Sequence, residues 1–186
     1  METPLTQHIK PGIAPAGINE YIKAGGYNGV DKALKRMQPS EIIDLVKSTG
    51  LTGRGGAGFP TGLKWSLMPK DDGQNGMRYL VANADEMEPG TFKDRYLLEG
   101  NPHQLIAGMI IASYAIRAQK AYIFIRWAYK KAEKIVKKAI AEAYEVGYLG
   151  KNILGTGFDL DLYLHASAGR YICGEETALL NSLEGK

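Results

Sequence analysis

Residues 78–86 read RYLVANADE, an apolar run that passes directly into an amide and two carboxylates. The first part, 78–82, has the composition of a buried strand. Two later segments, AYIFIR at 121–126 and LDLYLH at 160–165, have the same character. Helical patterns at 103–118 and 128–146 separate the three predicted strands. This alternation predicts a layered α/β domain.

The composition is typical of one soluble globular domain. The chain has 186 residues, of which 45% are hydrophobic, enough for a sizeable core. The longest apolar run, 105–116, has the length of a buried core helix, so we expect no transmembrane segment. Residues 1–4 lack the features of a secretion signal, and the single Cys173 cannot form an internal disulfide. These features predict a cytoplasmic protein.

The charge pattern gives little reason to expect a nucleic-acid partner. The net charge is only +3. Five lysines do share one face of the predicted helix 128–146, but Glu133 lies four residues before Lys137 and supports a solvated outer face. Prolines and glycines crowd residues 3–18, so we predict an N-terminal arm at 1–18 and one domain at 19–186.

Residues 53–62 read GRGGAGFPTG, in which five of ten residues are glycine. Glycine permits backbone conformations in which successive N–H groups converge on an anion such as phosphate. Arg54 and Lys64 add positive charge on either side, although a flexible turn is the alternative interpretation. The candidate ligand-binding residues of this loop are Gly53, Arg54, Gly55, Gly56, Ala57, Gly58, Phe59 and Lys64.

Two familiar phosphate motifs fit this loop poorly. Its glycines satisfy the generic G-x-G-x-x-G pattern, but that fingerprint follows a strand, whereas 39–50 looks like a helix capped by Ser40 and stopped by Gly50. A Walker A loop is excluded, because Trp65 follows Lys64 at the position where that motif needs a hydroxyl residue to hold magnesium.

Two further segments combine acids with a strand end. In α/β sheets ligands bind at the carboxyl ends of strands, where amide and carboxylate groups accept hydrogen bonds from hydroxyl or ring N–H groups. Solvated loop charges and helix caps are the alternatives, and for Thr91 and Asp94 we favour capping and charge pairing. In the second segment, the alternative is that Glu175 and Glu176 lie at a helix N-terminus, where the helix dipole favours negative charge. The candidates are Asn83, Asp85, Glu86 and Glu88, followed by Tyr171, Gly174, Glu175 and Glu176.

No metal site is predicted. Cys173 is interpreted as a small buried residue, and the three histidines are scattered along the sequence. His103 follows Pro102 and is expected near a helix start.

Taken together, the motifs resemble the NADH-binding flavoprotein subunits of bacterial respiratory complex I, from about residue 21 to 186. The markers are GRGGAGF at 53–59, GLKW at 62–65, NADE at 83–86, EPGT at 88–91, KDR at 93–95 and YICGEETAL at 171–179. The resemblance implies a Rossmann-like layered FMN/NADH-binding domain with a parallel-type sheet and flanking helices.

The resemblance also implies a cofactor arrangement. FMN is expected across the three loops, with NADH as substrate stacked on the flavin. Hydride then passes between the two rings, so no catalytic acid or base is assigned to the protein. Glu175 and Glu176 are expected to disfavour NADPH, because a carboxylate repels a 2′-phosphate. The nucleotide contacts implied are Gly56, Ala57, Phe59, Lys64, Glu88, Tyr171 and Glu176.

The implied role is electron input to NADH:quinone oxidoreductase. The expected partners are a thioredoxin-like [2Fe-2S] subunit and a large iron–sulfur subunit, with the membrane reached only through the complex. Relatives continue into ubiquitin-like and [4Fe-4S] domains, and a chain with Cys173 alone cannot hold that cluster. We therefore expect a partial chain, with two alternatives. One is a diaphorase subunit of an NAD-reducing hydrogenase or NAD-dependent formate dehydrogenase, and the other is a non-catalytic nucleotide-binding fragment.

Overall fold

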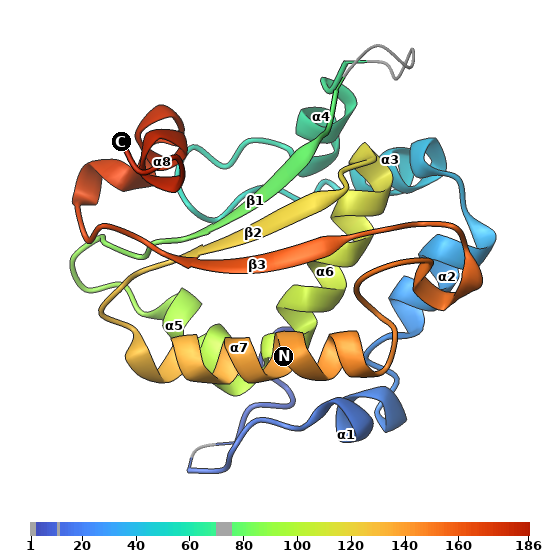
Figure 1. Ribbon diagram of the computed structural model, residues 1–186, viewed down its shortest axis with the longest axis horizontal. Helices are drawn as coiled ribbons and strands as arrows, with labels where there is room; N and C mark the ends of the chain where they lie inside the picture. Colours follow the sequence, from blue (N-terminus) through green and yellow to red (C-terminus); the bar gives the residue numbers. More distant parts are fainter. Residues whose placement is uncertain (1–2, 11, 70–75) are drawn as a thin grey trace.

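Three parallel strands form the sheet in the computed structural model, which describes residues 3–10, 12–69 and 76–186. The strands are β1 (Tyr79–Ala84), β2 (Lys120–Ile125) and β3 (Asp161–Ala166), in the order β1-β2-β3 (Figure 1). The predicted parallel α/β fold is confirmed. The strand bounds are displaced by one or two residues, so Asn83 and Ala84 belong to β1 and not to the loop after it.

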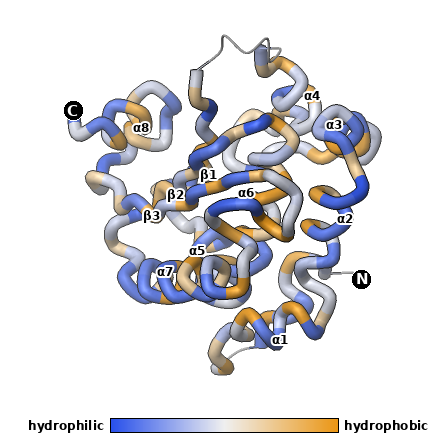
Figure 2. Tube along the Cα trace, turned by 45° about the vertical axis from the view of Figure 1, so that its right-hand side comes forward, coloured by the Kyte–Doolittle hydropathy of each residue, from blue (hydrophilic) through white to orange (hydrophobic). Residues whose placement is uncertain are grey.

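One face of the sheet is covered by the helices that connect the strands. α5 (Lys93–Gly100) and α6 (Pro102–Ile116) join β1 to β2, and α7 (Lys130–Glu145) joins β2 to β3. α7 buries Ala132, Val136, Ala139, Ile140 and Ala143 on its inner side. Its lysines are exposed, and Lys137 pairs with Glu133 at 2.7 Å, so the solvated-face interpretation is confirmed. Figure 2 shows hydrophilic residues recurring along α7.

The N-terminal helices pack around α6 and α7. They are α1 (Ile18–Lys23), α2 (Asn28–Arg36) and α3 (Pro39–Ser48). Ser40 does not cap α3, which corrects the sequence prediction. Pro39 takes the first helical position, where its missing N–H costs nothing, and the preceding residue, Gln38, becomes the cap. Within the predicted arm 1–18, Met1, Glu2 and Pro11 lie outside the described residues.

The other face of the sheet carries α8 (Glu176–Leu183), which follows the short 3-10 turn η2 (Tyr171–Gly174) (Figure 1). Leu179 of α8 packs with Phe124 of β2 and with Cys173, whose predicted burial is confirmed. A second 3-10 turn is η1 (Ile153–Gly155), and α4 (Thr61–Ser66) follows the glycine loop. Among the described residues no helix is both long and apolar enough to cross a bilayer.

Candidate functional site

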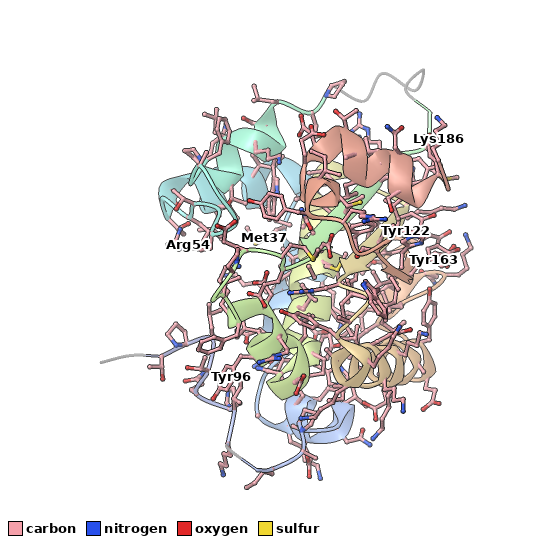
Figure 3. All side chains as sticks on the ribbon, turned by 90° about the vertical axis from the view of Figure 1, so that its left-hand side faces the viewer. Met37, Arg54, Tyr96, Tyr122, Tyr163 and Lys186 are labelled. Atoms are coloured by element: carbon pink, nitrogen blue, oxygen red, sulfur yellow. The ribbon has the colours of Figure 1, made fainter. Side chains whose placement is uncertain are left out.

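The three predicted loops meet at the carboxyl-terminal edge of the sheet, around a cavity of about 580 Å³. Figure 3 looks toward this edge, with Arg54 at one side and Tyr122 and Tyr163 of the sheet at the other. Ten predicted residues line the cavity: Arg54, Gly55, Gly56, Asn83, Asp85, Glu86, Glu88, Tyr171, Gly174 and Glu175. Six others do not line it: Gly53, Ala57, Gly58, Phe59, Lys64 and Glu176.

The glycine loop forms one wall of the cavity. An antiparallel bridge joins Thr52 to Pro60, and the N–H of Gly53 donates to the Phe59 carbonyl at 3.0 Å. Gly58 adopts φ +66°, a conformation that glycine reaches without strain. Within the described part of the chain, the N–H groups of residues 54–58 have no hydrogen-bond partner. They are therefore free to bind an anionic ligand.

The two positive side chains of this segment lie in different places. Arg54 turns back on its own loop, where its guanidinium donates to the Thr52 carbonyl at 2.8 Å and also to the Thr52 hydroxyl. Lys64 lies on α4 and Phe59 is half exposed. The Arg54 guanidinium is therefore bound to its own loop, although the residue lines the cavity.

Asn83 connects two of the three loops. Its Nδ2 donates to the Gly174 carbonyl at 3.0 Å, and its Oδ1 accepts the N–H of Asp85 at 3.1 Å. Because Asn83 is the fifth residue of β1, the strand itself fixes this side chain. The amide holds the wall formed by η2 against the end of the sheet.

Asp85 is one of two buried acids that line the cavity among the described residues, with 7% of its surface exposed. Its Oδ1 accepts a hydrogen bond from the Ser167 hydroxyl at 2.9 Å, whereas its Oδ2 has no partner among the described residues. Burial raises the pKa of Asp85, against the opposing effects of Ser167 and of the Arg126 charge. An unpartnered buried acceptor beside a cavity fits a ligand that brings an O–H or N–H donor.

Glu86 has a structural role that the sequence analysis did not separate from ligand binding. Its carboxylate accepts the N–H groups of Asp94 at 2.9 Å and Arg95 at 3.1 Å, so it caps α5. The Tyr129 hydroxyl donates to it at 3.0 Å. Burial alone would raise the pKa of Glu86, but these hydrogen bonds outweigh it and the pKa is lowered. The prediction that Thr91 caps this helix is wrong, since the N-cap residue of α5 is Phe92.

The outer rim of the cavity joins two loops through side chains. The Tyr171 hydroxyl donates to a Glu88 carboxylate oxygen at 2.7 Å, and this raises the pKa of Tyr171. Tyr171 is 64% exposed, so its ring is open to a ligand.

The two glutamates at the start of α8 differ in role. Glu175 is the N-cap residue and accepts the Ala178 N–H at 2.9 Å, which lowers its pKa. The interpretation of Glu175 as a helix-start residue is confirmed. Glu176 lies in the first turn and is exposed. The charge pairing predicted for Asp94 is also confirmed, and its partner is Lys93 at 2.7 Å.

Three residues that the sequence analysis missed support the site. Ser167 holds Asp85, Arg126 donates to the Glu86 carbonyl at 2.8 Å, and Tyr129 contacts the Glu86 carboxylate. All three follow the ends of β2 or β3. That position was the available signal, because parallel strands end at one edge of the sheet.

The arrangement fits a ligand with both anionic and donor groups. The loop N–H groups suit phosphate, and the Asp85 and Glu88 carboxylates suit hydroxyl or ring N–H groups, as in the ribityl chain and ring of FMN. In the described ranges, no group of three or more His, Cys, Asp or Glu side chains is placed to hold a metal ion.

Comparison with known proteins is consistent with this chemistry. Residues 46–186 match the family described as the Nuo51 FMN-binding domain. The NADH-quinone oxidoreductase F subunit of Escherichia coli (strain K12) is 57% identical over 183 residues, which cover 98% of this chain and 41% of the relative. The protein of the same name in Aquifex aeolicus (strain VF5) is 55% identical over 187 residues, which cover 100% of this chain and 43% of the relative. The chain thus spans less than half the length of these relatives.

A solved structure shares the fold. A chain of the NAD+-reducing [NiFe]-hydrogenase in its H2-reduced state is similar with a TM-score of 0.71 and 34% sequence identity. The match covers 100% of this chain and 28% of that chain.

Proposed function

Since the chain belongs to the family of NADH-quinone oxidoreductase F subunits, we propose that it forms the FMN- and NADH-binding part of an electron-input flavoprotein. The observation that carries the proposal is the cavity at the strand ends, which brings together loop N–H groups and an Asp85 carboxylate oxygen that have no partner in the described part of the chain. These groups have the complementary polarity that a flavin phosphate and its hydroxyls require.

In this proposal the cofactor is held by all three loops. The N–H groups of Gly55 and Gly56 bind phosphate, and Asp85 accepts a hydrogen bond from the ribityl chain or ring. Asn83 acts by fixing the position of Gly174, and Glu175 keeps α8 folded beside the cavity. Glu86 contributes through α5, which it caps, so it supports the wall.

The nucleotide is expected to enter past the outer rim, where Tyr171 offers an exposed ring for stacking and Glu88 offers a carboxylate for ribose hydroxyls. FMN, when bound, supplies the hydride acceptor and releases electrons one at a time. The protein orients the two rings and excludes water, and no side chain is required to move a proton. Phe59 and Lys64 stay predicted nucleotide contacts, on the loop and helix beside the rim.

The proposal extends to assembly. As a member of this family, the chain is expected to dock on a thioredoxin-like [2Fe-2S] subunit and a large iron–sulfur subunit, on the cytoplasmic side of the membrane. The [4Fe-4S] cluster belongs to the longer family protein and is not assigned to these residues. A diaphorase subunit is the second candidate, favoured by the hydrogenase structure. Its identity of 34% is well below the 57% of the Escherichia coli relative, so complex I is the preferred assembly.

FMN titration of the purified protein tests the proposal. Flavin fluorescence reports binding, and loss of flavin absorbance after anaerobic NADH addition reports hydride transfer. We expect both signals. Asp85→Asn should weaken FMN binding roughly ten- to a hundredfold, because it removes a charged hydrogen-bond acceptor. The matched control is Asp44→Asn, at an exposed carboxylate on α3. FMN that stays free at millimolar protein, or equal losses in both variants, would refute the proposed site.

A further inference from the structure

Ser167 is buried beside the proposed flavin site without lining its cavity. It directly follows β3, and its backbone N–H donates to the Ile125 carbonyl at 2.8 Å. Its hydroxyl oxygen accepts the N–H of Gly169 at 3.3 Å, and its hydroxyl proton is donated to Asp85 Oδ1 at 2.9 Å. Only 5% of its surface is exposed, so water competes little for these bonds.

We propose that Ser167 is a positioning residue that holds the Asp85 carboxylate in the orientation and charge state that FMN binding needs. The inference rests on the proposed function. Ser167 occupies Oδ1 and thereby leaves Oδ2 as the oxygen free to accept an O–H or N–H from the flavin. Gly169 fixes the direction of the hydroxyl, because its N–H occupies one lone pair of the serine oxygen.

The charges and burial around Asp85 make its pKa depend on the Ser167 hydroxyl. Burial raises the pKa of Asp85, and the Ser167 hydrogen bond and the positive charge of Arg126 oppose that rise. The other acids that line this cavity are Glu86, Glu88, Asp94 and Glu175, and Glu86 is directed to the N-terminus of α5. The cations that line it have other partners, since Arg54 donates to the Thr52 carbonyl and Lys93 pairs with Asp94. Loss of the hydroxyl therefore raises the pKa of Asp85 further and neutralises the acceptor at a higher pH.

A graded series of variants tests this role. FMN affinity is measured by fluorescence from pH 5 to 8 for the wild type, Ser167→Ala and Ser167→Cys, because a thiol is a weak donor of similar size. We expect Ser167→Ala to bind FMN about tenfold more weakly at pH 7. The pH at which affinity falls should move upward, with Ser167→Cys in between. Ser113→Ala is the matched control, since Ser113 is fully buried and its hydroxyl has no partner among the described residues.

A second measurement separates this inference from the proposed function. The Asp85 carboxyl is titrated by carbon NMR in the protein without FMN, where both Ser167 variants should show a higher pKa than the wild type. An unchanged Asp85 pKa, or unchanged FMN affinity and pH profile in Ser167→Ala, overturns the positioning role. If Ser167→Ala does not fold, Ser167→Cys decides by the same criteria. If the Ser167 variants raise the Asp85 pKa but the wild-type protein binds no FMN at any pH, the proposed function is overturned instead.

Discussion

The Tyr171 hydroxyl donates a 2.7 Å hydrogen bond to the carboxylate of Glu88 across 83 residues of sequence. This bond joins the loop after β1 to the turn before α8, at the rim through which a nucleotide is expected to pass. Both side chains are exposed, so this bond holds the Tyr171 ring and the Glu88 carboxylate in place where a ligand can reach them.

Removing the rim bond should affect nucleotide binding more than folding. Tyr171→Phe and Glu88→Gln are each expected to raise the Kd for NADH about fivefold, since the first removes the donor hydroxyl and the second removes the negative charge of the acceptor. The melting temperature should stay within about 2 °C, because the pair is exposed. The double variant should bind no more than slightly worse than either single one, as partners in one bond are not additive. Fully additive losses would show that the two residues act separately.

Glu176 is expected to contribute to nucleotide selectivity. Unlike Glu175, whose carboxylate accepts a backbone N–H, Glu176 is exposed at the first turn of α8. Glu176→Gln should raise the ratio of kcat/KM for NADPH to that for NADH about tenfold, because it removes one repulsive charge near a 2′-phosphate. Steady-state turnover with both nucleotides measures the ratio. An unchanged ratio, matched by Glu145→Gln on the exposed end of α7, would remove Glu176 from this role.

Glu86 should stabilise the fold in a pH-dependent way. Glu86→Gln is expected to lower the free energy of unfolding by about 1–3 kcal/mol at pH 7, since it weakens the cap of α5. The pKa of Glu86 is lowered from 4.5, so its contribution is present above that value and is lost as the pH falls through the folded-state pKa. Urea unfolding at pH 7 and pH 3.5 should therefore show the gap between variant and wild type shrinking in acid. A gap that stays constant would contradict this assignment.

His103 should make the protein less stable as the pH falls below neutrality. It is 1% exposed, and its Nε2 lies 2.9 Å from Glu142 Oε2 while Nδ1 lies 3.1 Å from the Tyr27 hydroxyl. Burial lowers its pKa from 6.5 despite the opposing Glu142 carboxylate, so the unfolded chain binds the proton first. The free energy of unfolding should fall between pH 8 and 5.5.

His103→Gln should flatten that dependence, whereas His8→Gln, at an exposed site, should preserve it. The measurement is urea unfolding across this pH range. Stability that instead rises toward pH 5.5 in the wild type would mean that Glu142 retains the proton on the imidazole in the fold.

The layered fold could be predicted from the sequence because apolar runs and helical periodicity are visible in the sequence itself, without tertiary information. The ends of elements were harder to place. Asn83 is polar, so the pattern ended β1 too early, although a polar residue facing a ligand site can complete a strand. Ser40 looked like a cap by residue type, but Pro39 at the first helical position sets Gln38 as the cap.

The sequence predicted most of the residues that line the cavity, but it did not predict the individual role of each residue. The three motifs identified most of the lining residues, because strand ends share one edge of a parallel sheet. Whether a carboxylate faces a ligand or a helix terminus depends on three-dimensional placement, which is why Glu86 could not be distinguished from Asp85. Ser167 escaped notice because a single serine has no motif, and only its distance to Asp85 shows its partner.

The parallel pairing of the sheet has a consequence for how the protein is made. Val81 pairs with Tyr122, and Tyr122 with Tyr163, so every ladder closes a loop of about forty residues before it gains contacts. The cavity is complete only after β3 has docked and residues up to Glu175 have left the ribosome. A ligand held by all three loops can therefore make its full set of contacts only after the sheet has formed.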